Sequence, residues 1–146
     1  MSYYSLMYGY KPDFSPVKRP VHKTAGRLVQ FANGEVKHED GRSIDFHDYL
    51  TGMSANCVVM AVIGNFMRPS GLLPNGLVIV NRAIRPKIGD IAGVRINGDN
   101  LIRRISKKDG KYYLIADDPR EPPYEIKEGD HVEMIGKVVR SINSYL

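Results

Sequence analysis

The sequence is poor in cysteine and in long apolar runs. Its single cysteine, Cys57, lies inside an apolar stretch, so an internal disulfide is excluded and a reducing, cytoplasmic setting is expected. No apolar run approaches the roughly 18 residues that a membrane-spanning helix needs. Residues 1–10 carry no charge, unlike the basic start of a secretory signal. We therefore expect a cytoplasmic protein without a membrane partner.

Metal-binding patterns are also missing. The four histidines, His22, His38, His47 and His131, show neither a metal-ligand spacing nor a pattern of carboxylate partners. We expect these histidines at the surface, and we expect no metal and no cofactor.

What is present suits a folded domain with many turns. Apolar residues make up 42% of the chain, too many for a disordered protein, and 14 glycines and 9 prolines are scattered between short segments. Residues 1–43 differ from the rest because Pro12, Pro16 and Pro20 interrupt them and no periodicity is sustained. We predict an N-terminal arm over residues 1–43, with a short strand over 27–31, and a domain over 44–146.

The domain is predicted to be mostly β. Residues 44–51 have the spacing of a short helix that ends before Gly52, and the apolar run 57–63 has the length of a buried strand. Strands separated by turn residues are then expected at 77–80, 90–96, 100–105, 112–115, 124–126 and 132–142. Asp109 and Gly110 predict a hairpin turn. Many short strands at this spacing indicate a compact, partly closed β structure with an extended arm.

The last strand suggests how the protein assembles. Apolar residues recur along 132–142, and Gly136 predicts a bulge or a close approach. A terminal strand exposes backbone donors and acceptors that a second copy can pair with. We predict a homodimer that uses Val132, Met134, Ile135, Val138 and Val139.

Positive charge is concentrated in residues 82–111, which hold nine Lys or Arg against three Asp. The candidate basic patch consists of Arg82, Arg85, Lys87, Arg103, Arg104, Lys107 and Lys108. Such a stretch attracts nucleic acid or an acidic partner, or it forms the solvated outer faces of alternating strands. No aromatic residues are interleaved with the basic ones in a nucleic-acid-binding motif, so we expect only weak, nonspecific nucleic-acid binding.

Several motifs occur together in the second half. Gly64-Asn65-Phe66-Met67 is followed by a glycine-containing loop, the turn Pro74-Asn75-Gly76 and the apolar run 77–80. The run Gly89-Asp90-Ile91, the stretch 97–105, the stretch 113–118 and the stretch 132–139 follow in order. This pattern over about residues 44–142 resembles the LexA/UmuD family of self-cleaving serine peptidases. Residues 1–43 leave no room for the helix-turn-helix domain of LexA, so a UmuD-like organisation is expected.

The resemblance implies a serine nucleophile and a neutral lysine base, and both positions differ here. The serine position falls on Phe66, whose ring has no lone pair for attack, and the lysine position falls on Arg103, whose guanidinium stays protonated. The two positions are 37 residues apart, which matches the family spacing. We therefore predict that the chain is not an enzyme.

The sequence holds other candidate nucleophiles and a candidate cleavage site. Ser54, Cys57 and Ser70 lie near Phe66, but Cys57 lies inside an apolar run, and Ser70 and Asp117-Asp118 have the pattern of turns. Ala25-Gly26 matches the residue pair at which the family cuts itself, so it is interpreted as a remnant of a cleavage site or as a turn.

The resemblance implies partners in the DNA-damage (SOS) response. The leading hypothesis is an inactive, dimeric, UmuD-like binding protein in DNA repair and translesion synthesis, with a Y-family DNA polymerase, a RecA filament or another LexA/UmuD-like protein as its partner. The alternatives are a self-cleaving peptidase with an unrecognised nucleophile and a transcription-related accessory protein that binds nucleic acid.

Overall fold

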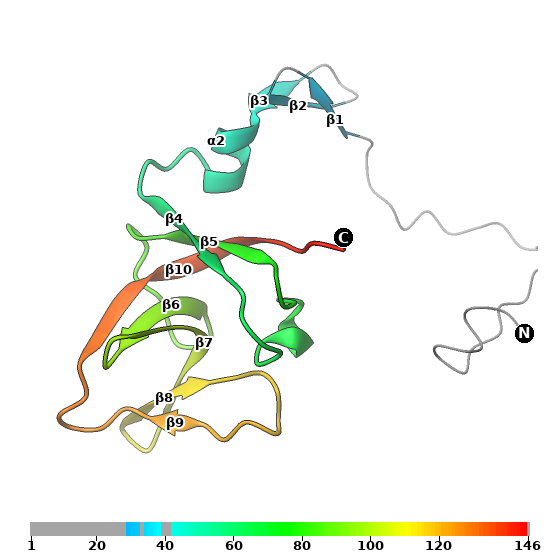
Figure 1. Cartoon of the computed structure of the whole chain (residues 1–146). Helices are drawn as coiled ribbons and strands as arrows, with labels where there is room; N and C mark the ends of the chain where they lie inside the picture. The colour runs from blue at the N-terminus through cyan, green and yellow to red at the C-terminus, as the bar shows by residue number, and fades with distance from the viewer. Residues whose placement is uncertain (1–28, 33, 39–41, 146) are drawn as a thin grey trace, which may run out of the picture.

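The computed structural model describes residues 29–32, 34–38 and 42–145. The predicted arm as far as residue 28, with the candidate cleavage pair Ala25 and Gly26, lies outside the described residues. Within the described part, no helix has the length and apolarity needed to cross a lipid bilayer. The mostly-β prediction is confirmed, because the described residues form ten strands and little helix (Figure 1).

A small three-stranded sheet precedes the main one. Its strands β1 (Val29–Ala32), β2 (Glu35–His38) and β3 (Ser43–Asp45) pair antiparallel in that order. The helix α2 (Phe46–Thr51) follows β3 directly. The helix was predicted from residue 44, but it begins at Phe46 because the Asp45 carboxylate accepts a hydrogen bond from the amide of Asp48 and caps the first turn.

The main sheet has seven antiparallel strands in the order β4-β5-β10-β6-β7-β8-β9. Their bounds are β4 (Cys57–Ala61), β5 (Leu77–Asn81), β6 (Ile91–Ile96), β7 (Asp99–Lys108), β8 (Lys111–Ile115), β9 (Tyr124–Glu125) and β10 (Val132–Ile142). Between β4 and β5 lies a short 3-10 turn, η1 (Arg68–Ser70). The β7–β8 turn uses Asp109 and Gly110, both with positive φ, as the sequence predicted.

Two apolar clusters hold the sheet together. Val78 and Val80 of β5 are fully buried in the first cluster, and Val94 of β6 and Leu114 of β8 are in the second. Burying such side chains is worth about 1.5–3 kcal/mol each, so these clusters stabilise the sheet.

The last strand lies inside the sheet and not at its edge. Residues 132–137 of β10 pair with β6, and residues 137–142 pair with β5. Sequence adjacency to the terminus gave no information on strand order. The predicted bulge at Gly136 is confirmed, because the register against β6 shifts between Met134 and Gly136.

One edge strand of the sheet is β4, and the other is β9. Among the described strands, β4 pairs only with β5, in the register that sets Val59 opposite Ile79. The sequence predicted a buried strand over 57–63, but the strand ends at Ala61 and is only half-buried. Val58 and Met60 pack on the core, whereas Val59 is 57% exposed.

Candidate functional site

A groove separates β4 from β7, two strands that are not neighbours in the sheet. One wall is the stretch from Val59 to Ile63 and the other is the stretch from Asn100 to Arg103, with Phe66 and Met67 at one end. The hollow has a volume of about 440 Å³. Its lining is mostly apolar, with one cationic side chain, Arg103.

Phe66 and Arg103 are in contact inside this groove. The guanidinium carbon of Arg103 lies 4.7 Å from the centre of the Phe66 ring, which is the geometry of a cation–π pair. The Nη1 group of Arg103 also donates to the Ile102 carbonyl at 2.9 Å. Burial lowers the pKa of Arg103 from its ordinary value, while the Glu121 carboxylate acts in the opposite direction. The two positions singled out by the resemblance therefore lie side by side.

The loop that carries Phe66 has little freedom. Gly64 adopts a φ of +74°, and a β-carbon there would lie 2.8 Å from the Phe66 ring, so the ring rests directly on the glycine. The Phe66 carbonyl accepts a hydrogen bond from the amide of Asp118 at 3.0 Å. The ring is thus held between Gly64 and Arg103, and its backbone is tied to the loop after β8.

A second set of contacts joins the same two loops, the one that carries Phe66 and the one after β8. Asp117 accepts hydrogen bonds from Arg104 and from the Ser70 hydroxyl, and Arg104 Nη2 also lies 3.0 Å from Ser70 Oγ. The bond to Asp117 raises the pKa of Arg104. The cluster of Ser70, Arg104 and Asp117 is called the clamp below. The sequence indicated only turns at Ser70 and Asp117 and did not predict it. The strand pattern could have indicated a separate contact for Arg104. Neighbouring residues of a strand point to opposite faces, so the Arg104 side chain cannot share the groove with Arg103.

The contacts in the clamp argue against Ser70 as a nucleophile. Its hydroxyl lies between an ion-paired carboxylate and a guanidinium, and neither is a base like a neutral lysine. The other two candidates have structural contacts. Ser54 Oγ accepts from the amide of Asn56 at 3.2 Å, and Cys57 Sγ lies 3.7 Å from the Thr51 carbonyl.

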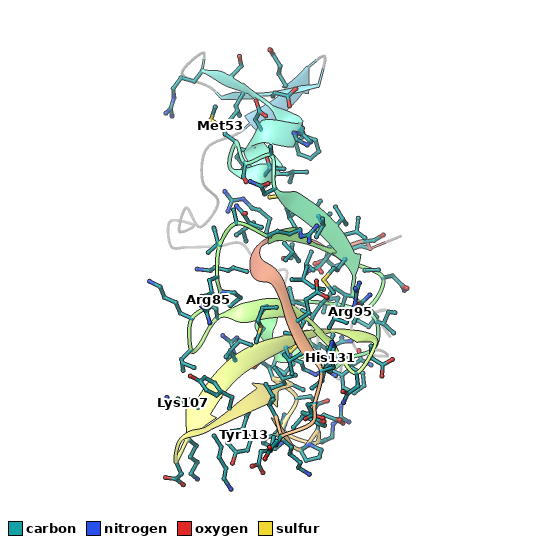
Figure 2. The ribbon with its side chains drawn as sticks, turned by 90° about the vertical axis from the view of Figure 1, so that its left-hand side faces the viewer. Met53, Arg85, Arg95, Lys107, Tyr113 and His131 are labelled. Atoms are coloured by element: carbon teal, nitrogen blue, oxygen red, sulfur yellow. The ribbon has the colours of Figure 1, made fainter. Side chains whose placement is uncertain are left out.

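Three residues of the predicted basic patch have different local contacts. Arg103 lies in the groove and Arg104 in the clamp, whereas Lys107 lies over the Tyr112 ring at 5.1 Å. Arg85 and Lys107 lie on the same side of the ribbon in Figure 2, and Arg95 lies on the opposite side. The basic stretch therefore supplies several separate local environments.

One group of possible metal ligands occurs among the described residues. Ligand atoms of Asp45, His47 and Asp48 lie within 4.8 Å of one another. All three are at the start of α2, where the Asp45 carboxylate already accepts the Asp48 amide. His47 is exposed, as predicted. The capping geometry accounts for the grouping.

Comparison with known proteins assigns the fold to a family. The family model for Peptidase S24-like proteins matches residues 22–139, which is most of the chain. The protein belongs to this family. Among curated relatives, the S24-like chain is 26% identical over 108 residues to a LexA repressor of Oleidesulfovibrio alaskensis, covering 68% of this chain and 52% of the relative.

Two further LexA repressors give similar values. The match to that of Streptomyces coelicolor is 30% identical over 81 residues, covering 56% of this chain and 33% of the relative. That of Cupriavidus taiwanensis is 29% identical over 86 residues, covering 59% and 40%. The S24-like chain thus spans about half, or less, of the length of these relatives.

Proposed function

We propose that this S24-like protein binds another protein in the groove between β4 and β7 and does not cut it. The observation that carries the proposal is the Phe66–Arg103 contact of 4.7 Å. By resemblance, these positions hold the family's nucleophile and base. A phenyl ring has no atom for acyl transfer, and a guanidinium keeps its proton at neutral pH.

The same residues suit the groove for binding. Phe66 is 37% exposed and Val59 57% exposed, so both offer apolar surface to a ligand. Arg103 adds a half-buried cation that is held in place by stacking. Preorganised side chains lose little entropy when a partner docks, which favours affinity.

The cellular role is proposed from the family relationship. LexA repressors are relatives of this chain, and the UmuD-like pattern suggests a dimeric subunit in the DNA-damage (SOS) response, in the cytoplasm. An error-prone DNA polymerase of the Y family, a RecA filament or a LexA/UmuD-like protein is the proposed partner. Nucleic acid is a weaker candidate, because Arg104 and Lys107 already make contacts within the chain.

Affinity purification from cells after DNA damage tests the binding half of this proposal. The tagged chain is compared with the variant Ile63→Asp, since Ile63 lines the groove and is 83% exposed, and with Tyr145→Asp as a control that is 84% exposed and lies outside the groove. We expect a full-length partner with the wild type and the control, and its loss with Ile63→Asp. Recovery of a partner in cut form, or equal recovery with Ile63→Asp, contradicts the proposal.

A further inference from the structure

Among the residues that the structure describes, β4 has a free edge, which is arranged to accept another strand. Its even-numbered residues bond to β5, as shown by the Arg82 amide, which donates to Asn56 at 2.9 Å, and the Val62 amide, which donates to Gly76 at 2.8 Å. Hydrogen bonding alternates along an antiparallel strand, so the amides and carbonyls of Cys57, Val59 and Ala61 point away from β5. An exposed row of this kind is a template for an added peptide strand.

The groove continues along this edge. A second hollow of about 380 Å³ shares Val59, Met60 and Asn100 with the first. Together the two hollows form one channel beside β4. We call it the β4 channel and define it by the residues that line either hollow. It follows the strand from Val58 to Ile63, a length of about 20 Å for an extended peptide.

The β4 channel carries a net positive charge. Its charged lining residues are Arg82, Arg95, Arg103 and Glu133. Glu133 is already paired with Arg95 at 3.6 Å, and Arg82 is exposed at the end of β5. An incoming chain therefore meets an excess of guanidinium groups beside an apolar wall.

The chain's own arm has the wrong charge for this channel. Residues 17–28 contain Lys18, Arg19, Lys23 and Arg27 and no acidic residue. Like charges brought together at an interface are unfavourable and suppress the wrong partner. The basic arm is thus a poor occupant, and an acidic strand is a good one.

We propose that the β4 channel binds an extended, acidic segment of a partner protein, which adds to β4 as a strand. Its apolar side chains lie on the wall formed by Val59, Ile63 and Phe66, and its carboxylates meet Arg82, Arg95 and Arg103. The inference rests on the proposed function, because a groove that cut its ligand would release it as product and would not hold it as an added strand. A peptide is favoured over nucleic acid because the β4 edge offers backbone donors and acceptors.

Fluorescence anisotropy with the full chain tests this assignment. The probes are labelled decapeptides of alternating Glu and Val, of alternating Gln and Val and of alternating Lys and Val, together with a peptide of residues 17–28 and an oligothymidine strand. We expect the Glu–Val peptide to bind about tenfold more tightly than the Lys–Val peptide and the arm peptide. We also expect its affinity to fall with added salt.

Two pairs of variants distinguish the contribution of the channel's charge to peptide binding from the contribution of strand addition. Arg82→Glu lines the channel, and its matched control Arg85→Glu lies in the same loop outside it. Val59→Pro removes an outward amide, which an edge strand tolerates, and Val59→Ala controls for the lost side chain. We expect Arg82→Glu and Val59→Pro to weaken binding of the Glu–Val peptide at least about fivefold relative to their controls. Circular dichroism checks that each variant is folded.

Three outcomes overturn the inference. They are tighter binding of the arm peptide than of the Glu–Val peptide, equal binding to Arg82→Glu and Arg85→Glu, and oligothymidine binding that depends on Arg82 but is unaffected by Val59→Pro. None of them touches the proposed function, which fails separately if the purified chain cuts itself or its partner.

Discussion

Asp117 and Arg104 form a bidentate pair that joins the loop after β8 to β7. Arg104 Nε donates to Oδ1 at 3.0 Å and Arg104 Nη2 donates to Oδ2 at 2.9 Å. The Ser70 hydroxyl donates to the same carboxylate. Because Ser70 belongs to the turn that follows Phe66, this pair positions one end of the groove.

Removing the carboxylate should therefore destabilise the fold. The Asp117 side chain is 14% exposed and that of Arg104 is 35% exposed, so Asp117→Ala leaves a partly buried cation without its partner. We expect the free energy of unfolding to fall by about 1–3 kcal/mol, measured by urea denaturation.

The control for that variant is an exposed ion pair. Lys111 lies 3.5 Å from Glu125 with its side chain 61% exposed, and Lys111→Ala should change stability by less than about 0.5 kcal/mol. Equal losses for Asp117→Ala and Lys111→Ala would show that Asp117 has no special structural role.

Gly136 and Gly93 face each other in the sheet and predict unequal responses to alanine. A β-carbon at Gly136 would overlap the carbonyl of Asn81 and lie 2.9 Å from Cα of Arg82, all backbone atoms that cannot move alone. A β-carbon at Gly93 would lie 2.7 Å from the sulfur of Met60, a flexible side chain.

We expect Gly136→Ala to cost about 3 kcal/mol or more and Gly93→Ala about 1 kcal/mol, by thermal or chemical denaturation. A Gly136→Ala variant as stable as Gly93→Ala would contradict the close approach of β10 and β5.

Local features of this fold were accessible to sequence reasoning. Asn97-Gly98 and Asp109-Gly110 each supply the two positive φ angles of a tight hairpin turn, and both hairpins form. The bulge at Gly136 also follows from one residue. These features depend on neighbours in the chain, which a sequence displays directly.

Features that depend on distant pairing were not accessible. β10 lies between β5 and β6, strands formed about 40 to 60 residues earlier, and nothing in residues 132–142 indicates two partners. The contact of Phe66 with Arg103 was anticipated only by resemblance. The clamp of Asp117 with Ser70, 47 residues away, was not anticipated at all.

The Asp118–Arg120 pair predicts an acid-range titration. Hydrogen bonds from the Arg120 side chain and amide lower the pKa of Asp118 from its ordinary value to about 2. A depressed carboxyl pKa contributes stability that is present above the ordinary value and is lost as pH falls through the folded value. We expect the titration of the Asp118 carboxyl, followed by carbon-detected NMR, to have its midpoint near this lowered pKa.

The variant Arg120→Ala should move the Asp118 midpoint upward, toward the ordinary range for aspartate. The carboxyl of Asp130, whose pKa is lowered by hydrogen bonds from the Asn97 side chain and the Lys127 amide, serves as the internal reference and should not move. An unchanged Asp118 midpoint in the variant would contradict the assignment.

A homodimer remains a prediction, now with a different physical basis. Because β10 lies between β5 and β6 in the sheet, we expect a dimer through this strand to use side chains such as Met134, which is 40% exposed. We expect light scattering to give twice the chain mass of 16.4 kDa, and Met134→Glu to halve that value.

The dimer should survive Val59→Pro, because the β4 edge is assigned to the partner segment. A wild-type mass of 16.4 kDa across micromolar concentrations would contradict the dimer. A dimer that is lost only in Val59→Pro would place the second copy on β4 instead.

The central claim is that the groove binds without cutting. Self-cleavage of the family type needs a nucleophile and a base that loses its proton, so each single variant, Phe66→Ser or Arg103→Lys, restores only one half. We expect both single variants to stay intact, like the wild type, with or without a RecA filament.

The most direct measurement is the intact mass of the purified wild-type chain after incubation at about pH 10, where a buried lysine base with a lowered pKa would be neutral. The account predicts one species with the mass of the whole chain. A fragment beginning at Gly26, formed at a rate independent of protein concentration and insensitive to inhibitors of contaminating proteases, would reveal an intramolecular nucleophile and contradict the account.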